Sequence, residues 1–293
     1  MSGVHALVES ALRNAWAFEE LPWHLEVDPE RNVFPESFFA SGLREYRAMS
    51  DVERRTFDFH ETCFHLSNLL AGERSGEHLI AQVLVLTAHE RPAHREFLAV
   101  MAAEEAKHFL ALRRYLSDKA GALYPPCPEL RASLDAIEAC DFAELKVLVG
   151  QVLLEWNAAS MVATLLTKAR EPLLAAVLRV NLKDEGRHLA YSQELREPLK
   201  KVISGRVAPE MEDIVFESIR ASVAALLARP VWDELGLPAR QMRRHALDRL
   251  ERMGVLHRYR TVVPEQLERC GFPAARLRRR LGKGLVKGLI ADG

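Results

Sequence analysis

The chain has 293 residues, of which 48% are hydrophobic and 28% charged, a composition typical of a globular protein with a sizeable core. The formal net charge is −1, so no strong overall field favours binding to nucleic acid. The four cysteines form no C-x-x-C pair, and the N-terminus lacks the basic and apolar regions of a signal peptide. We therefore expect reduced thiols and a cytoplasmic protein.

Helical periodicity dominates the chain, and strand patterns are almost missing from the sequence. Residues 1–50 are expected to form short helices and loops interrupted by prolines. A capping-box pattern at 50–53 predicts a long first helix that ends near residue 90. Pro92 suits the first turn of a second helix that ends near residue 118, and a short helix fits 128–139.

A second capping-box pattern, at 141–144, predicts a third long helix to about residue 169, and Pro172 opens a fourth to about 205. Three or four further helices are expected in 210–293, broken at Pro230, Pro238, Pro264 and Pro273. The prediction is an all-α fold with a four-helix core at 51–205. An N-terminal extension at 1–50 and a basic C-terminal extension at 206–293 would pack on it.

The third predicted helix contains an isolated acid. Residues 147–167, VLVGQVLLEWNAASMVATLLT, contain one charged side chain, Glu155. The stretch is long enough to span a bilayer, but its polar residues favour a buried core helix. Burial of an ionised carboxylate costs several kcal/mol unless it is paired. A protonated acid, a buried Arg or Lys, or a metal ion would each explain Glu155.

Two Glu-x-x-His pairs lie on the second and fourth helices, and the spacing of each places a carboxylate and an imidazole on one helix face. Chance alone can supply such pairs, so their height in the bundle matters. With four antiparallel helices and a rise of about 1.5 Å per residue, the pairs and one Glu from each other helix reach one level. This is the layout of a dimetal carboxylate site. Its members are Glu73, Glu105, His108, Glu155, Glu185 and His188.

The alternative is that Glu155 is a buried acid bonded to Asn or Ser and that the histidine pairs are solvated. The segments GERSGEHLIAQ, EEAKHF, LLEWNAASM and DEGRHLAY resemble the ligand helices of ferritin-like non-haem diiron oxygenases and oxidases. That superfamily includes ribonucleotide reductase small subunits, acyl carrier protein desaturases, bacterial hydroxylase subunits and arylamine N-oxygenases. The resemblance covers about residues 60–200. It implies that the six residues named above are iron ligands, with no catalytic residue beyond them.

The roles of three further acids near the implied ligands each have an alternative. Glu77 competes with Glu73, one turn away on the same face, but Glu73 fits the common level better. Glu104 and Asp184 precede the Glu of each Glu-x-x-His pair. The resemblance implies that they hydrogen-bond the far ring nitrogens of the histidine ligands, whereas the alternative is a solvated acid at a helix edge.

The resemblance implies two iron ions, or a manganese–iron pair, that activate O2 reductively. The expected reaction is hydroxylation, desaturation or N-oxygenation of a small organic substrate in secondary metabolism, with an external reductase or ferredoxin as electron donor. A homodimer without membrane association is also implied. A metal-binding helical protein without turnover and an RNA-modifying diiron hydroxylase remain as alternatives. Leu112 replaces the radical tyrosine usual in reductase small subunits, and Asn181 replaces the extra histidine common in arylamine N-oxygenases, which disfavours both subgroups.

Two further groups of residues each allow more than one interpretation. Small or apolar residues near the ligands could line a substrate pocket or could simply pack the helices tightly: Leu70, Gly76, Met101, Ala102 and Ala159. Further histidines on the first helix and in the turn after it are interpreted as mostly surface or capping residues: His60, His65, His78, His89 and His94.

The segment from Pro238 to Gly288 contains fourteen Arg or Lys and four Asp or Glu, a local excess of +10. It could be a solvated face that packs on the acidic remainder of the chain. It could also dock an acidic partner, such as an acyl or peptidyl carrier protein that presents a tethered substrate. Nucleic acid is the least favoured partner, because no aromatic residues alternate with the basic ones.

Overall fold

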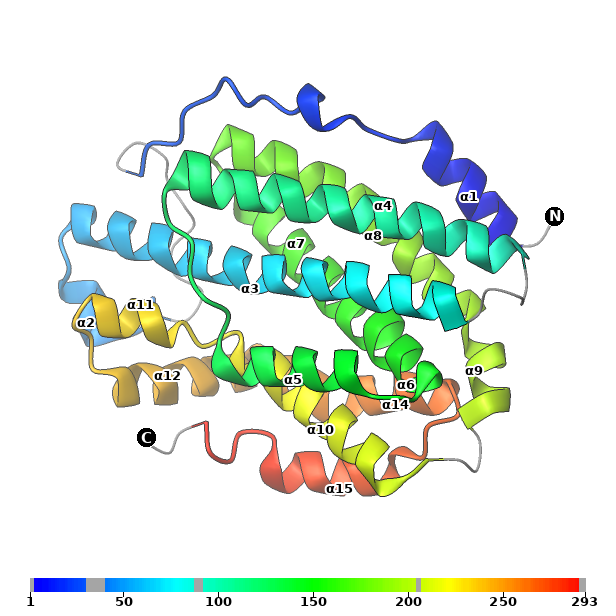
Figure 1. The fold of residues 1–293 in the computed structure, drawn as a ribbon. Helices are drawn as coiled ribbons and strands as arrows, with labels where there is room; N and C mark the ends of the chain where they lie inside the picture. The colour runs from blue at the N-terminus through cyan, green and yellow to red at the C-terminus, as the bar shows by residue number, and fades with distance from the viewer. Residues whose placement is uncertain (1–2, 30–39, 87–91, 204–206, 290–293) are drawn as a thin grey trace.

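The structure, a computed structural model, describes residues 3–29, 40–86, 92–203 and 207–289, and no β-strand occurs among them. Two helical hairpins form a ferritin-like four-helix bundle, which confirms the predicted all-α class (Figure 1). The first hairpin pairs α3 (Asp51–Leu86) with α4 (Pro92–Arg114). The second pairs α6 (Ala143–Val147), η3 (Leu148–Leu154) and α7 (Glu155–Lys168) with α8 (Pro172–Glu194).

Local capping explains where two of these helices begin. The Ser50 N–H donates to Glu53 Oε2 at 2.7 Å, and the Glu53 N–H donates to Ser50 Oγ at 3.3 Å, so the predicted capping box is confirmed. The Glu171 side chain accepts hydrogen bonds from the first N–H groups of α8. The capping box predicted at 141–144 does not form, because Phe142 is the N-cap of α6 and makes no side-chain cap bond.

The connection between the two hairpins differs from the prediction of four antiparallel helices. After α4 come a π-helical segment, η2 (Tyr115–Ala120), and α5 (Pro128–Ala139), which matches the predicted short helix. Figure 1 shows α5 carrying the chain back along the bundle, so α4 and α7 run in the same direction and not antiparallel. The common level survives this change because Glu105 and Glu155 both lie near mid-bundle, 13 residues after Pro92 and 12 after Ala143.

Two predicted long helices are interrupted. The third contains η3, a π-helical segment that ends directly before Glu155; such segments are frequent at functional sites. The fourth ends at Glu194 and is followed by α9 (Arg196–Ile203). The break at Leu195 has a local cause, because Pro198 donates no N–H and its ring would clash with the carbonyl of Glu194.

The extensions cover two faces of the bundle. The first helix, α1 (Gly3–Arg13), packs on α4 and α8, whereas α5 and the C-terminal helices cover the face formed by α3 and η3 (Figure 1). Pro264 does not end a helix as predicted, because α13, η4 and α14 are continuous and a π-helical segment precedes it. The division of the chain at residues 50 and 205 stays a prediction.

The remaining elements are η1 (Phe18–Glu20), α2 (Arg44–Ala48), α10 (Pro209–Ala224), α11 (Arg229–Glu234), α12 (Ala239–Arg252), α13 (Val255–His257), η4 (Arg258–Val262), α14 (Val263–Arg269) and α15 (Ala274–Gly284).

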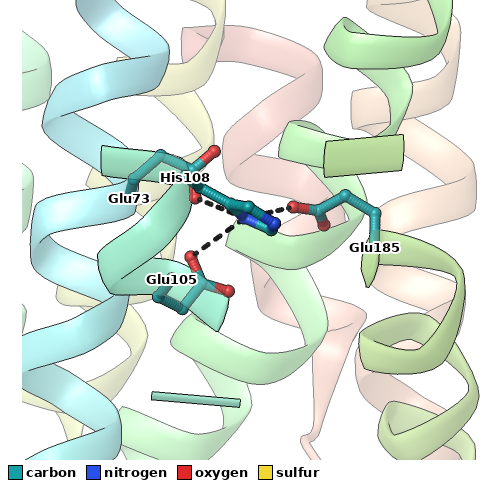
Figure 2. A group of neighbouring side chains, drawn as sticks. All are labelled: Glu73, Glu105, His108 and Glu185. Carbon is teal, nitrogen blue, oxygen red and sulfur yellow. Dashed lines mark ion pairs between the residues drawn. The ribbon is translucent and has the colours of Figure 1, made fainter. Parts of the chain in front are cut away.

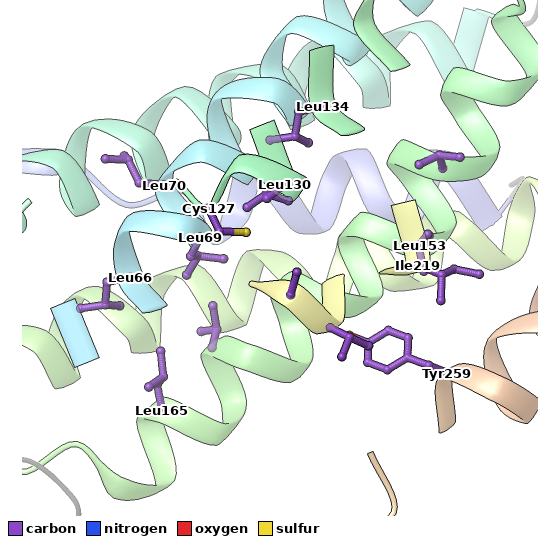
Figure 3. Close-up of a cluster of buried hydrophobic side chains, with 14 of the residues drawn as sticks. Leu66, Leu69, Leu70, Cys127, Leu130, Leu134, Leu153, Leu165, Ile219 and Tyr259 are labelled. Atoms are coloured by element: carbon purple, nitrogen blue, oxygen red, sulfur yellow. The ribbon is translucent and has the colours of Figure 1, made fainter. Parts of the chain in front are cut away.

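The core is continuous from the bundle into the C-terminal helices. Figure 3 shows Leu153 of η3 beside Ile219 of α10, and both belong to the same core cluster as leucines of α3, α5 and α7 and Tyr259 of η4. The segment Ala143–Lys168 is apolar and long enough to cross a membrane, but 44% of its most apolar window is buried inside the fold. Core helices of soluble proteins often pass this test. Since the segment packs on α3 and α8 and carries Glu155, its contacts are those of a core helix.

Candidate metal centre

The structure brings the six predicted ligand residues together in the middle of the bundle. Each is at most 5% exposed, so the group is enclosed by the four core helices. Glu77, the alternative to Glu73, is only half-buried and does not belong to the cluster. The six residues are Glu73 on α3, Glu105 and His108 on α4, Glu155 on α7, and Glu185 and His188 on α8.

These side chains form two sets of ligand atoms, and within each set all atoms lie within 4.8 Å of one another. Glu105 and Glu185 belong to both sets. Glu73 and His108 complete the first set, and Glu155 and His188 complete the second. The centre can therefore hold two metal ions that share two carboxylates, and mixed carboxylate and imidazole donors suit iron or manganese.

The first set converges on one ring nitrogen. His108 Nδ1 lies 3.4 Å from Glu73 Oε2, 3.9 Å from Glu105 Oε2 and 3.7 Å from Glu185 Oε1. Figure 2 shows the three carboxylates approaching the imidazole from three different helices. An ion placed among these atoms would receive one nitrogen and several oxygens.

The second set has the same form around His188. Its Nδ1 lies 3.1 Å from Glu105 Oε1, 3.2 Å from Glu155 Oε2 and 4.0 Å from Glu185 Oε2. Glu155, the isolated acid of its helix, thus has an imidazole and two other carboxylates as neighbours. No Arg or Lys pairs with it among the described residues. Of the three explanations for its burial, a metal ion fits these neighbours best.

The far ring nitrogens face two further acids. His108 Nε2 lies 3.1 Å from Asp184 Oδ2, and His188 Nε2 lies 3.0 Å from Glu104 Oε2. Each acid belongs to the helix opposite its histidine. If each Nε2–H donates to its acid, each Nδ1 keeps a lone pair directed at the carboxylate cluster, which is the form a metal requires. The structure thus places both acids where the predicted role needs them.

Two residues that sequence reasoning missed support these acids. Arg187 donates to Asp184 Oδ1 and, at 2.5 Å, to Glu104 Oε1. It lies within the Asp-Glu-x-Arg-His string, so a local signal existed. Trp16 Nε1 donates to Asp184 Oδ2 at 2.8 Å, and its ring lies nearly parallel to that of His108, with centroids 6.4 Å apart. Trp16 is 168 residues away from Asp184, so no local pattern could indicate it.

Electrostatics in the cluster reflect crowded buried charge. Burial, and then the charge of Glu155, raises the pKa of Glu105 and of Glu185 well above the usual value. Burial opposes the charged form of His108 and His188, but hydrogen bonds to Asp184 and Glu104 respectively outweigh it and raise both pKa values. In the absence of metal, the cluster therefore favours bound protons in place of cations.

The donor set fits two divalent ions. Buried atoms of the cluster make no hydrogen bond within the described residues, namely Glu73 Oε1, Glu105 Oε1, His108 Nδ1 and both carboxylate oxygens of Glu185. Unsatisfied buried acceptors of this kind cost free energy unless something binds them. Two divalent cations would bring four positive charges to the four clustered carboxylates and would use these free positions.

A mainly apolar cavity of about 110 Å³ borders the centre on the side of α3 and α7, and Glu73, Glu105, Glu155 and Glu185 form part of its wall. Gly76, predicted as a pocket residue, lines it. A Cβ at Gly76 would lie 3.4 Å from Glu105 Oε2, an ordinary van der Waals distance, so Gly76 lies directly beside that carboxylate. Leu70 instead lines a separate groove, and Met101, Ala102 and Ala159 are not among the described residues that line the cavity.

His65 was missed as a cavity residue. It was interpreted as a surface or capping histidine, yet it is 2% exposed and lines the cavity. Burial lowers the pKa of His65 to about 4, so the ring is neutral at pH 7. Its sequence position offered no signal, because part of the cavity wall comes from α10 and η4, which are distant from His65 in the sequence. His89 lies outside the described residues.

The acids behind the histidines should tune metal affinity. We expect Asp184→Asn to weaken binding of Fe(II) by about 10- to 100-fold. The neutral amide oxygen of asparagine would accept the hydrogen bond from His108 Nε2–H more weakly than the charged carboxylate of Asp184 does. Competition with a chelator of known affinity would measure this. Lys183→Ala, an exposed neighbour on the same helix, should leave affinity unchanged. Equal affinities in Asp184→Asn and wild type would contradict the role assigned to Asp184.

Comparisons with known proteins add little to this geometry. The chain matches no protein-family profile and no curated protein. Among solved structures, it is similar to a variant of an R2-like ligand-binding oxidase with an anaerobically reconstituted Mn/Fe cofactor. The identity is 14%, 92% of each chain is covered, and the TM-score is 0.47. The chain itself forms a four-helix bundle with a buried cluster of carboxylates and histidines, as the resemblance of its sequence segments implied.

Proposed function

We propose that the protein is an O2-activating oxidoreductase with a dinuclear iron or manganese–iron centre that oxidises a small organic substrate. One observation carries this proposal. Two ligand sets that share Glu105 and Glu185 lie beside an apolar cavity, so a substrate could reach the metals without water filling the space. A buried cluster that served only to stabilise the bundle would not require such a cavity.

The bound metals would supply the reduction of O2, and the protein residues would supply the surroundings. Glu105 and Glu185, which belong to both ligand sets, would contribute to holding both ions, and His108 and His188 would each offer one ring nitrogen. Asp184 and Glu104 fix the orientation of the rings through the bonds of 3.1 and 3.0 Å. The apolar cavity wall excludes water and places a carbon or nitrogen of the substrate next to the ions.

The balance of the reaction requires an external reductant. Hydroxylation takes up O2, two electrons and two protons, places one oxygen atom in the substrate and releases the other as water. Desaturation with the same electron supply removes two hydrogens from the substrate and releases two waters. The reductase or ferredoxin expected from the resemblance would supply the electrons. The carrier-protein partner and hydroxylation as the specific reaction are part of the proposal.

Metal content and oxygen uptake test the proposal together. After anaerobic reconstitution with Fe(II) and desalting, we expect about two irons per chain, as the two ligand sets require. On mixing with O2 and a reductant, the loaded protein should consume O2 at least tenfold faster than the same iron in buffer. Parallel loading with Mn(II) and Fe(II) would identify a mixed centre, because these donors suit both metals.

The outcomes separate the proposed function from its alternative. Two bound irons without accelerated O2 uptake, with every reductant tried, would favour a metal-binding protein without turnover. No retained iron would contradict both.

Four arginines of the basic C-terminal segment already pair with Glu251, Glu268, Glu212 and Asp213 of the C-terminal helices. Since no observation favours RNA over a small molecule, we do not propose the RNA hydroxylase function.

A further inference from the structure

The cavity beside the metal cluster has a neighbour that leads outward. This outer cavity, of about 240 Å³, lies between α7 and the C-terminal helices. Its walls include Trp156, Leu250 and Val255, and its rim includes the exposed residues Met253 and Arg258. None of its described lining residues is a carboxylate. The two cavities share five wall residues: His65, Asn157, Met161, Leu226 and Tyr259.

The shared wall forms a polar neck between two mainly apolar spaces. The Tyr259 hydroxyl donates to Asn157 Oδ1 at 2.9 Å, and Asn157 Nδ2 donates to Ser222 Oγ at 2.8 Å. Figure 3 shows the Tyr259 side chain extending from its helix toward α10. Asn157 belongs to the bundle, whereas Ser222 and Tyr259 belong to the C-terminal extension. The neck therefore exists only where the extension packs on the core.

The neck also keeps hydrogen-bonding capacity. A side-chain amide has two N–H groups, and Ser222 takes one from Asn157. The Tyr259 oxygen can accept a bond in addition to the one it donates. His65, which also lines both cavities, is neutral and buried, and its ring already has a hydrogen bond to the backbone of Ala225. A neutral ligand with a carbonyl or amide group would find partners here, while a charged group would lose hydration without a counter-charge.

We infer that the two cavities form one substrate channel whose outer half is built by the C-terminal extension. The Tyr259–Asn157–Ser222 neck selects elongated, uncharged, mainly apolar molecules with a hydrogen-bonding group near their middle. The inference rests on the proposed function of the centre and names the substrate class for it. Tyr259 and Asn157 are specificity-determining residues in this scheme and not metal ligands.

The volumes limit the reacting end of the ligand. A cavity of about 150 Å³ accommodates benzene, so the inner cavity of about 110 Å³ takes roughly four carbon atoms. The larger outer cavity would hold the tail. The expected ligand thus has a short apolar end beside the metals, a carbonyl or amide at the neck and a longer apolar tail toward Met253 and Arg258.

A series of uncharged probes tests this without turnover. The probes are 6-bromohexyl amides of linear acids from acetic to octanoic acid, added anaerobically to the metal-loaded protein. The bromine quenches tryptophan fluorescence on contact, and Trp156 lines the outer cavity. We expect affinity to rise about fourfold per acyl methylene up to about pentanoyl, because each buried CH₂ contributes equally, and then to stop rising.

Three variants sharpen the test. Trp156→Phe should abolish the quenching signal, which locates the tail. Ala158→Phe fills the inner cavity alone, so the acetyl probe should still bind while the gain from longer acyl chains disappears. Thr167→Phe, on the exposed side of α7, should behave as wild type. Tyr259→Phe should weaken all the amides by about 2- to 10-fold through loss of a neutral hydrogen bond.

The results separate this inference from the proposed function. No binding of any probe to wild type, an affinity independent of acyl length, or quenching that persists in Trp156→Phe would overturn the channel. Each of these results comes from wild type or a conservative variant, so the test does not depend on correct folding of Ala158→Phe. Fast O2 uptake without probe binding would contradict the channel but support the oxidase function. Probe binding as expected without O2 uptake would contradict the oxidase function but support the channel.

Discussion

Glu105→Ala is expected to reduce bound iron from about two ions per chain to nearly none. Glu105 belongs to both ligand sets, with Oε2 lying 3.9 Å from His108 Nδ1 and Oε1 lying 3.1 Å from His188 Nδ1. Its loss removes a donor from each ion and unbalances the shared charge. Anaerobic reconstitution, desalting and elemental analysis would measure the retained iron.

Two control variants make this prediction specific. Glu77→Ala removes the half-buried carboxylate one turn from Glu73, outside the cluster, and should retain both irons. Glu155→Ala removes a donor from the second set only, and we expect about one iron to remain. Retention of two irons by Glu105→Ala would contradict the shared role. Loss of iron in Glu77→Ala would instead assign the α3 ligand to Glu77.

The metal-free protein is expected to lose stability as the pH rises from about 5 to 9. Glu105 and Glu185 have raised pKa values when folded, so the fold disfavours their charged forms increasingly above the unfolded pKa of about 4.3. His108 and His188 also have raised pKa values. Their contribution is complete below about pH 6.5 and is lost as the pH rises through the folded pKa.

Both effects have the same sign, because the folded state holds more protons than the unfolded state. One extra bound proton corresponds to a loss of about 1.4 kcal/mol per pH unit, or, for a chain of 293 residues, a Tm lower by about 2 °C per unit. The opposite effect of Asp184, whose pKa is lowered to about 2, acts only below about pH 4. Thermal unfolding of chelator-treated protein across this pH range would measure the slope.

Metal binding should reverse this trend. Two divalent ions replace the protons, so loading with Fe(II) should release protons and raise Tm most at high pH. At a free metal concentration a hundredfold above Kd, each ion contributes about 2.7 kcal/mol. A metal-free protein whose Tm is flat or rises between pH 5 and 9 would contradict the account of the buried cluster. Glu77→Ala serves again as the matched control.

The structure disagrees with the alternative interpretations of Glu155 and of the histidine pairs. Burial of Glu155 with only an Asn or Ser partner disagrees with its closest neighbour, His188 Nδ1 at 3.2 Å. Solvation of the histidine pairs disagrees with rings that are completely buried. Leu112, which stands at the position of the radical tyrosine, is buried in the core. Asn181 is likewise fully buried, one turn before Glu185, where an imidazole would be a seventh ligand.

The four core helices and the six side chains that meet between them could be predicted from the amino-acid sequence alone. Capping residues and prolines mark where helices begin, and a constant rise converts residue number into height. Glu105 and Glu155 lie near mid-bundle, so even a wrong direction for α7 left them at the right level. Periodicity also places Glu and His of each pair on one face, which is a local property.

The surroundings of the metal centre, in contrast, depend on contacts between segments that are far apart in the sequence. Trp16 reaches Asp184 across 168 positions, and Tyr259 reaches Asn157 across 102. The cavity wall combines α3 and α7 with α10 and η4, whereas the residues expected to line it lie mostly on other faces. Such contacts follow from how α5 returns along the bundle and how the extensions pack. They depend on pairwise fit between distant segments, which neither periodicity nor helix rise encodes.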